Sequence, residues 1–277
     1  MTTTAYVGTS GWRYPRWRGD FYPPGLVQRR ELEYLAERMP SVELNGSFYS
    51  LQRPESYRRW RSEVPETFVF AVKGSRYVTH MLRLRNIDAA LANFFASGVL
   101  ALGPTLGPIL WQLPERVEFD PEVFGGFLCR LPRTTGEALD LARGHDARLD
   151  GRSWLEIDAD APLRYAVEPR SSTFGDPRAT ELLREHGVAL VVADTAGRWP
   201  AFDAVTAHHV YVRLHGSTEL YSSGYTAAEL DEWADRIRGW RSATDRHGNP
   251  REVFVYFDND ARGRAPHDAI ALAERLR

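Results

Sequence analysis

Short apolar runs alternate with longer amphipathic stretches along the whole chain. The apolar runs are rich in β-branched and aromatic residues, and most are continuous rather than interrupted at every second position. Strands that are buried on both faces of a sheet have this pattern, because neither face meets water. The pattern therefore predicts eight buried strands, at residues 5–8, 42–45, 68–73, 109–112, 165–168, 188–194, 210–215 and 253–258.

Amphipathic helices are predicted between most of these strands. Pro54, Pro177 and Pro266 stand where a proline favours the first turn of a helix, since its missing N–H has no partner to lose there. Thr226 precedes Glu229 at the spacing of a capping box, which predicts a helix start. The predicted helices cover residues 27–39, 54–63, 87–100, 177–186, 227–240 and 266–276.

Eight strands that alternate with helices indicate an α/β fold with a parallel sheet and right-handed crossovers. Eight is also the number of strands that closes a (β/α)8 TIM barrel. The competing fold, a doubly wound open sheet, usually has a G-x-G-x-x-G turn after its first strand, whereas residues 8–12 read GTSGW. Because no linker-like tract divides the chain, residues 1–277 are predicted to form one TIM-barrel domain, with room for irregular or extra helices.

The composition is that of an ordinary globular protein. Apolar residues make up 43% of the chain, and 35 Lys and Arg oppose 37 Asp and Glu for a formal net charge of −2. These values exclude a disordered or collagen-like chain, and they give no support to bulk binding of nucleic acid or a membrane surface. No apolar run is long enough to span a bilayer, and the first ten residues lack the features of a secretory signal. The sole cysteine, Cys129, follows the apolar stretch FGGFL, which predicts an inert core thiol, and a cytoplasmic location is expected.

Polar or ionisable residues stand at the carboxyl end of every predicted strand, which is the edge where α/β barrels place their sites. Several lie two positions apart on one strand, so that both members of each pair face the same side. We therefore expect them to converge at the mouth of the barrel. The set comprises Ser10, Glu43, Asn45, Lys73, Gln112, Glu168, Arg170, Asp194, Arg213, His215, Asp258 and Asn259.

One member of this set, Lys73, is the only lysine among the 35 basic residues. Arginine replaces lysine readily on a surface, but not where a compact, titratable amine is needed. Lys73 is therefore a candidate base or Schiff-base nucleophile. Glu168 and His215 are candidates for an acid–base couple, and Asp194 is either catalytic or the structural partner of an arginine.

The remaining strand-end residues suit substrate binding. Arg170 and Arg213 are expected to clamp a carboxylate or phosphate through bidentate hydrogen bonds. Asn45, Gln112 and Asn259 carry neutral amides, whose hydrogen bonds orient a substrate without adding charge. Glu43 and Asp258 add carboxylates to the same pocket. The structural alternative is a buried layer of ion pairs that plugs the barrel mouth.

Two loops add candidate contacts. Residues 12–22, WRYPRWRGDFY, are dense in aromatic and arginine residues, so Trp12 and Tyr14 are candidates for stacking on a sugar ring or base. The same pattern also fits a small satellite core that caps the barrel. His80 lies in the loop after the third strand and is a weaker candidate for substrate binding.

These residues predict an enzyme, a hydrolase, lyase or isomerase, that acts on a small anionic or sugar-like substrate without a cofactor. No G-x-S-x-G, H-E-x-x-H, Walker A or C-x-x-C motif is present. One alternative is a sugar isomerase- or endonuclease-like barrel that binds Mn²⁺ or Mg²⁺ through Glu168, Asp194, His215 and Asp258. The other is a non-enzymatic module that binds a protein or single-stranded nucleic acid through residues 12–22 and the arginines at 53, 58, 59 and 61.

Several blocks of sequence, in order, resemble the YecE-like family, domain of unknown function 72. They are GTSGWRYPRWRGDFYP at residues 8–23, VELNGSFYS at 42–50, PETFVFAVKGSRYVTH at 65–80, LGPILWQLP at 106–114, AVEPRSSTF at 166–174, VRLHG at 212–216 and VYFDNDARGRAPHDA at 255–269. The resemblance implies a (β/α)8 barrel with no established reaction. The chain departs from the family pattern at Pro169, where an aromatic residue is usual, and at Asp258, where an asparagine is usual. The family's recurrent polar residues correspond here to Glu43, Asn45, Lys73, His80, Gln112, Glu168, Arg170, Arg213, His215 and Asn259.

Overall fold

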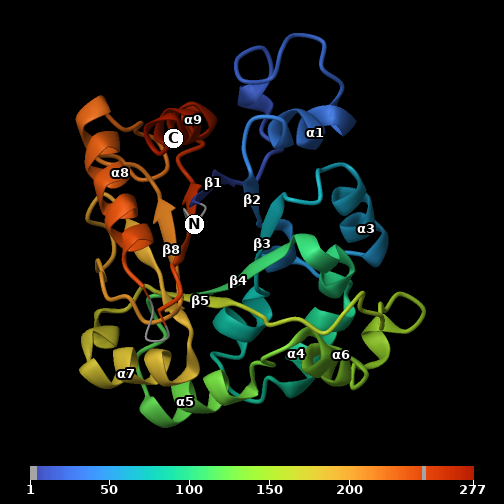
Figure 1. Ribbon diagram of the computed structural model, residues 1–277. Coiled ribbons are helices and arrows are strands. Elements are labelled where there is room, and N and C mark those ends of the chain that lie inside the picture. Colours follow the sequence, from blue (N-terminus) through green and yellow to red (C-terminus); the bar gives the residue numbers. More distant parts are fainter. Residues whose placement is uncertain (1–4, 245–247) are drawn as a thin grey trace. The chain divides into compact units, whose positions relative to one another are not determined.

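The computed structural model describes residues 5–244 and 248–277. These residues form two compact units (Figure 1). Unit 1 combines the two ends of the chain, Met1–Glu43 and Ala189–Arg277, and unit 2 is the middle, Leu44–Val188.

Parallel strands form the centre of unit 1. Their hydrogen-bonded order is β2-β1-β9-β8-β7, so the first and last strands of the chain are neighbours. A first strand that pairs in parallel with the last is the closing pair of an α/β barrel. The bounds are Ala5–Ser10 for β1, Ser41–Leu44 for β2, Ala189–Leu190 for β6, Val192–Asp194 for β7, His209–Leu214 for β8 and Glu252–Phe257 for β9.

Unit 2 continues the same pattern with three parallel strands in sequence order. β3 (Val69–Lys73) pairs with β4 (Leu106–Leu113), which pairs with β5 (Tyr165–Pro169). Every residue of β3 and β5 is buried, as their continuous apolar runs predict. The neighbours within each unit are those of a (β/α)8 barrel, and the predicted fold class is confirmed. One predicted strand, 188–194, is divided into β6 and β7; the prediction of a single domain stays a prediction.

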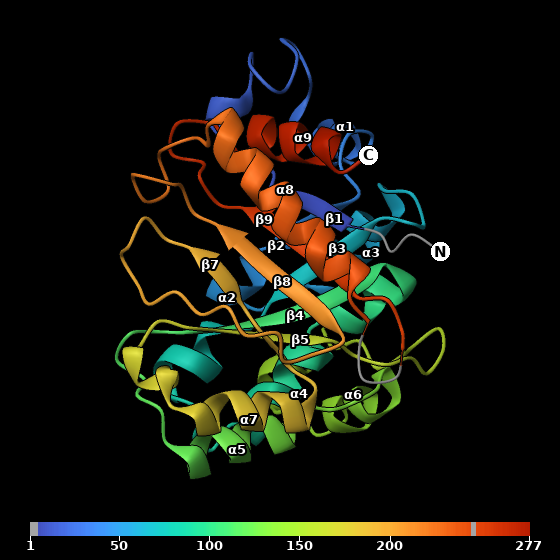
Figure 2. The ribbon, with the colours of Figure 1, turned by 60° about the vertical axis from the view of Figure 1, so that its left-hand side comes forward.

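Helices cover the strands of each unit. In unit 1, α8 and α9 lie side by side and pack against β9, while α9 also packs against β1 (Figure 2). In unit 2, α5 lies beside α7, and α4 packs against α6 (Figure 2). The bounds are Glu31–Ala36 for α1, Gly46–Tyr49 for α2, Pro54–Ser62 for α3, Asp88–Ala96 for α4, Pro121–Arg130 for α5, Thr135–Ala142 for α6, Pro177–His186 for α7, Ala227–Ser242 for α8 and Ala265–Arg275 for α9.

The helix ends follow local chemistry that the sequence predicts. The capping box of α8 is confirmed: the backbone N–H of Thr226 donates to Glu229, whose own N–H donates to the Thr226 hydroxyl. α7 begins at Pro177 and ends before Gly187, which has a left-handed φ of 63°.

The structure corrects the prediction made for Cys129. Cys129 lies on α5, a helix that the apolar pattern did not predict, and its thiol is exposed. The prediction of a core thiol is therefore wrong, because FGGFL packs only one face of that helix, through Phe124, Phe127 and Leu128.

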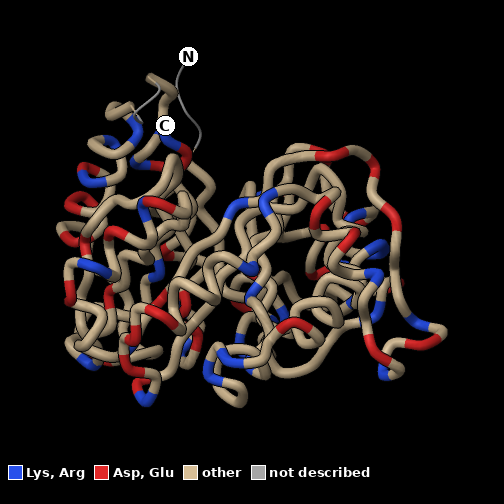
Figure 3. Tube along the Cα trace, turned by 90° about the horizontal axis from the view of Figure 1, so that it is seen from below, with Lys and Arg blue, Asp and Glu red and all other residues tan. Residues whose placement is uncertain are grey.

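The loop of residues 12–22 forms a packed cap. Trp17 and Tyr22 are fully buried, and their rings pack against each other and against Phe21. Tyr34 of α1 contacts both Phe21 and Tyr22. The loop therefore does not offer an open surface on which a base could stack. Charges of both signs are interspersed along the chain (Figure 3).

Candidate functional site

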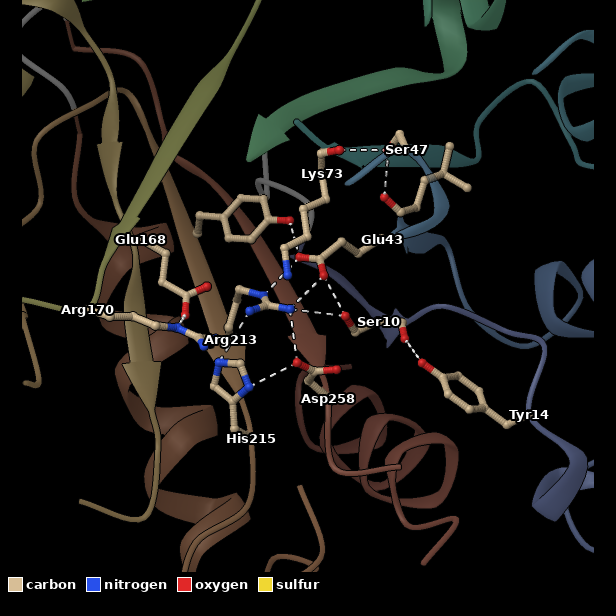
Figure 4. Close-up of polar contacts among 12 residues, drawn as sticks. Ser10, Tyr14, Glu43, Ser47, Lys73, Glu168, Arg170, Arg213, His215 and Asp258 are labelled. Carbon is tan, nitrogen blue, oxygen red and sulfur yellow. Dashed lines mark hydrogen bonds and ion pairs between the residues drawn. The ribbon is translucent and has the colours of Figure 1, made fainter. Parts of the chain in front are cut away.

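Arg213, which is 0% exposed, lies at the centre of a buried polar network in unit 1 (Figure 4). Its Nη2 donates to Glu43 Oε1 at 2.8 Å and to Asp258 Oδ2 at 3.0 Å, and its Nε donates to Glu43 Oε2 at 3.0 Å. The parallel register places Ser10 of β1 beside Glu43 of β2, so the carboxyl ends of these strands meet. We call this set the Arg213 network; it comprises Ser10, Glu43, Tyr211, Arg213, His215 and Asp258.

Glu43 is saturated with donors. Besides the two Arg213 bonds, the Ser10 hydroxyl donates to Oε1 at 2.5 Å and the Tyr211 hydroxyl donates to Oε2 at 2.7 Å. Burial and the nearby Glu43 carboxylate raise the pKa of Tyr211 well above its usual value, so its proton stays in place as a donor. Glu43 and Arg213 therefore hold each other, and they match the structural alternative of a buried ion-pair layer.

His215 is fully buried between Arg213 and Asp258 (Figure 4). Its Nε2 lies 3.4 Å from Arg213 Nη1, and its Nδ1 lies 3.0 Å from Asp258 Oδ2. Because a guanidinium only donates, a hydrogen bond between these two side chains requires Nε2 to accept, and Nδ1 is the ring nitrogen on the side of Asp258. The side chain of Asp258 is 19% exposed. It is therefore the member of this pair that solvent can reach.

Asp260 is a residue of this region that the strand-end pattern missed. It follows Asp258 by two positions and is 9% exposed. Burial, and next the charge of Asp258, raise the pKa of Asp260 well above its usual value, while Tyr14 and Trp17 act in the opposite direction. The sequence carries a signal for Asp260 in the run Asp258-Asn259-Asp260. Two carboxylates two positions apart at a strand end repel each other, which marks the second one as a candidate for the same region.

The other predicted residues of unit 1 have partners within the fold. The Tyr14 hydroxyl donates to the Ser10 carbonyl at 2.5 Å, and Trp12 is buried. Asn259 donates to Ser223 O at 2.9 Å and to Asp268 Oδ2 at 2.7 Å. Asp194 lines a separate pocket of about 430 Å³ with Ser217, Tyr225 and Glu229 among its neighbours.

Unit 2 holds a second group at the ends of β3, β4 and β5, which we call the Lys73 cluster: Lys73, His80, Gln112, Glu168 and Arg170. Gln112 and Glu168 are register partners on neighbouring strands and are both buried. Arg170 Nε donates to Glu168 Oε1 at 3.2 Å, as expected for residues two apart at a strand end (Figure 4). Asn45 lies just before α2, outside β2.

Lys73 ends β3 and is 8% exposed. Its Nζ lies 4.4 Å from the centre of the Phe48 ring, a cation–π contact, and its carbonyl accepts from the Ser47 hydroxyl at 2.7 Å (Figure 4). A Cβ at the next residue, Gly74, would lie 2.3 Å from the Trp111 ring. Glycine is therefore required there for the buried Trp111 to pack against the end of β3.

His80 lies in a five-residue π-helix, Tyr77–Met81, directly after β3. Its ring packs edge-to-face on Phe48, with 5.1 Å between ring centres, so Phe48 contacts both His80 and Lys73. Burial lowers the pKa of His80 to about 4, and the positive charges of Arg76, Lys73 and Arg170 contribute to this shift. His80 is therefore neutral at pH 7 in a positive field.

The metal alternative gains no ligand set. Within residues 5–244 and 248–277, no three His, Cys, Asp or Glu side chains form a group suited to a metal ion. In unit 1, Asp258 Oδ2, an oxygen of one of the four suggested metal ligands, accepts a hydrogen bond from Arg213. Glu168 and His215 lie in different units, and their partnership as an acid–base couple stays a prediction.

The nucleic-acid alternative stays a prediction, and the structure removes part of its support. The rings of residues 12–22 are packed inward, and three of the four arginines at 53–61 have partners. Arg58 stacks on Trp154 at 5.3 Å, Arg61 pairs with Asp158 at 2.6 Å, and Arg59 Nε lies 3.8 Å from Glu63. In the described part of the chain, no helix has the length and apolar character needed to cross a membrane.

The parallel strands and the helices between them define an α/β barrel protein, with ionisable residues at the carboxyl ends of the strands in each unit. The sequence profile described as "Protein of unknown function DUF72" matches residues 6–277, and the chain belongs to that family.

Relatives and solved structures of the same family are similar to this chain. The chain is 30% identical to the UPF0759 protein YecE of Escherichia coli K12 over 276 residues, which cover 98% of this chain and 92% of YecE. The fold is similar to that of a DUF72 family protein from Thermotoga maritima, with a TM-score of 0.74 and 23% identity over 99% of both chains. A DUF72 family protein from Enterococcus faecalis has a TM-score of 0.71 and 16% identity, over 99% of this chain and 95% of that one. The two structures support the fold.

Proposed function

We propose that this protein is an enzyme that binds a small anionic substrate at the Lys73 cluster and acts on it by acid–base chemistry assisted by Lys73. The observation that carries the proposal is that His80 and the largely buried Lys73 pack on the same Phe48 ring at the end of β3, where Arg76 and Arg170 add positive charge. A positive field at strand carboxyl ends attracts an anion, and a neutral imidazole there can donate or accept a hydrogen bond without adding charge.

Each member of the cluster has a role that its chemistry allows. Arg170 binds the anionic group of the substrate, because a guanidinium matches carboxylate or phosphate oxygens. Glu168, held by Arg170 at 3.2 Å, accepts a proton from the substrate. Gln112, beside Glu168 in register, orients the substrate through its amide.

Lys73 is the residue whose replacement distinguishes this proposal from a merely structural cluster. Its amine either accepts a proton or adds to a substrate carbonyl; in the second case a C–N bond forms and water leaves as the imine is made. Arginine cannot perform either step, because its guanidinium stays protonated. The choice of lysine at this one position, in a chain with 34 arginines (35 basic residues less Lys73), supports a chemical requirement.

In unit 1, His215 and Asp258 form a candidate proton-transfer pair. His215 Nδ1 lies 3.0 Å from Asp258 Oδ2, and Asp258 is the partly exposed member of the pair. We propose that this pair supports the same enzyme as an acid–base group.

The experiment is a turnover screen by proton NMR with small phosphate- and carboxylate-bearing compounds, with wild type, Lys73→Arg and Glu168→Gln in parallel. Both variants should keep the wild-type circular dichroism spectrum and lose turnover by about 10²-fold or more, the usual effect of removing an acid–base group. The exposed Glu122→Gln serves as the matched control and should retain full turnover. Unchanged turnover by Lys73→Arg would overturn the assigned role of the amine.

A further inference from the structure

A surface pocket of about 580 Å³ opens in unit 2 beside the Lys73 cluster. It is lined by Arg76, His80, Met81, Arg83, Pro114, Glu115 and Arg116. A pocket of this size holds a small molecule. The lining shares His80 with the Lys73 cluster, so the pocket adjoins the proposed site.

Two connections, the one between β3 and α4 and the turn after β4, bring the three arginines of the pocket together. Arg76 directly precedes the π-helix, Arg83 follows it, and Arg116 lies in the turn after β4 in which Val117 N donates to Pro114 O at 2.9 Å. Among the described residues, none of these arginines has an ion-pair partner within 4.0 Å. Three arginines and Glu115 give the lining a formal charge of 3 − 1 = +2, since His80 is neutral at pH 7.

The backbone that carries Arg83 is held in an unusual conformation. Arg83, Leu84 and Asn86 have left-handed φ values of 51°, 66° and 51°. Side-chain-bearing residues seldom adopt this region, and leucine is among those that it suits least. Leu84 is buried and so anchors the segment, while Arg83 and Arg85 are exposed.

This segment directly follows the π-helix that contains His80, so two uncommon backbone forms adjoin one pocket. Both π-helical turns and strained non-glycine residues occur preferentially at functional sites. The strained segment sets the position of Arg83 at the pocket.

We propose that this pocket binds a phosphate monoester dianion, with Arg76, Arg83 and Arg116 around the phosphate, so that the substrate of the enzyme is a small phosphorylated compound. The charge of +2 matches a dianion and exceeds what a single carboxylate or a phosphodiester needs. Three guanidinium groups also match the several oxygens of a phosphate better than the two oxygens of a carboxylate. The proposal rests on the proposed function for its link to catalysis, because the pocket meets the Lys73 cluster at His80.

Isothermal titration calorimetry at about pH 8 and constant ionic strength tests the pocket. Inorganic phosphate, which is mainly a dianion there, should bind wild-type protein, whereas acetate and dimethyl phosphate should bind at least about tenfold more weakly. Arg83→Gln and Arg116→Gln should each weaken phosphate binding about tenfold, the effect of one charged hydrogen-bonding group. Glutamine is no better suited than arginine to the left-handed region, so Arg83→Gln leaves the backbone strain unchanged.

Arg130→Gln is the matched control. Arg130 lies on α5 of the same unit, is outside this pocket and pairs with Asp88 at 2.9 Å on the surface. Its variant should bind phosphate like wild type. Equal binding of phosphate and dimethyl phosphate, no phosphate binding, or unchanged affinity in both pocket variants would overturn the proposal.

The two proposals can fail separately. Phosphate binding that depends on Arg83 and Arg116, together with full turnover by Lys73→Arg, would support the pocket and refute the proposed lysine chemistry. Turnover of a carboxylate that needs Lys73 and is unaffected by Arg83→Gln would support the enzyme and refute the phosphate pocket.

Discussion

Glu43→Gln tests whether the Arg213 network is held by buried charge. Glu43 and Arg213 are both 0% exposed, and Glu43 accepts four hydrogen bonds, two of them from Arg213. Glutamine keeps the shape but replaces one accepting oxygen by an amide that donates, and it removes one of the two carboxylates that neutralise Arg213. Breaking a buried ion pair on one side destabilises a protein by about 3–5 kcal/mol. We expect a loss in that range, because Asp258 remains as a single, partly exposed counter-ion.

Urea unfolding at neutral pH, followed by circular dichroism, measures the change in the free energy of unfolding. Arg213→Met should be the more damaging variant, because it leaves both Glu43 and Asp258 without their cation. The double variant should lose less than the sum of the single changes, since the two residues share one interaction. Glu33→Gln is the control: Glu33 makes a similar two-point contact with Arg30, but on the exposed surface, and no measurable change is expected. A loss below about 1 kcal/mol for Glu43→Gln would refute the buried-charge account.

Three further predictions concern titration and exposure. Burial raises the pKa of Asp260 above the unfolded value of about 3.9, so its contribution to stability is complete below that value and is lost as the pH rises through the folded pKa, by at most about 1.4 kcal/mol per pH unit. In urea unfolding across this range, Asp260→Asn should make the free energy of unfolding decline less steeply with pH. Parallel curves for wild type and variant would contradict this account. NMR titration should place the pKa of His80 near 4, and Arg76→Gln should raise it, since one repelling positive charge is gone; an unchanged pKa would exclude that charge as a cause. Ellman's reagent should modify Cys129 in the folded protein, because the thiol is exposed, whereas reaction only after denaturation would restore the core assignment.

The strands could be predicted because most of them are buried on both faces, which produces a continuous apolar run. The helices α5 and α6 escaped prediction, although Thr134 caps α6 and Asp120 caps α5. Gly125 and Gly126 weaken the helical signal of α5. Cys129 was misjudged for the same reason, because only a helix places it on the face opposite Phe124.

The strand-end residues were predictable as a set, because a parallel strand must finish at the same edge as its neighbours. Their contacts were partly predictable: the two-residue spacing correctly pairs Glu168 with Arg170 and Arg213 with His215. The third carboxylate, Asp260, and the pocket at Arg83 were not predictable. Both depend on which distant side chains surround a group, and spacing along the chain carries no information about that.

The solitary lysine has a practical consequence for spectroscopy. Protein prepared with isotopically labelled lysine will give a single side-chain signal set, and that signal will come from the end of β3. Because Lys73 Nζ lies 4.4 Å from the centre of the Phe48 ring, aromatic ring currents should shift the resonances of the side chain away from those of a solvated lysine. The chain thus contains a built-in reporter, and a compound that enters this part of the barrel can be detected without any added label.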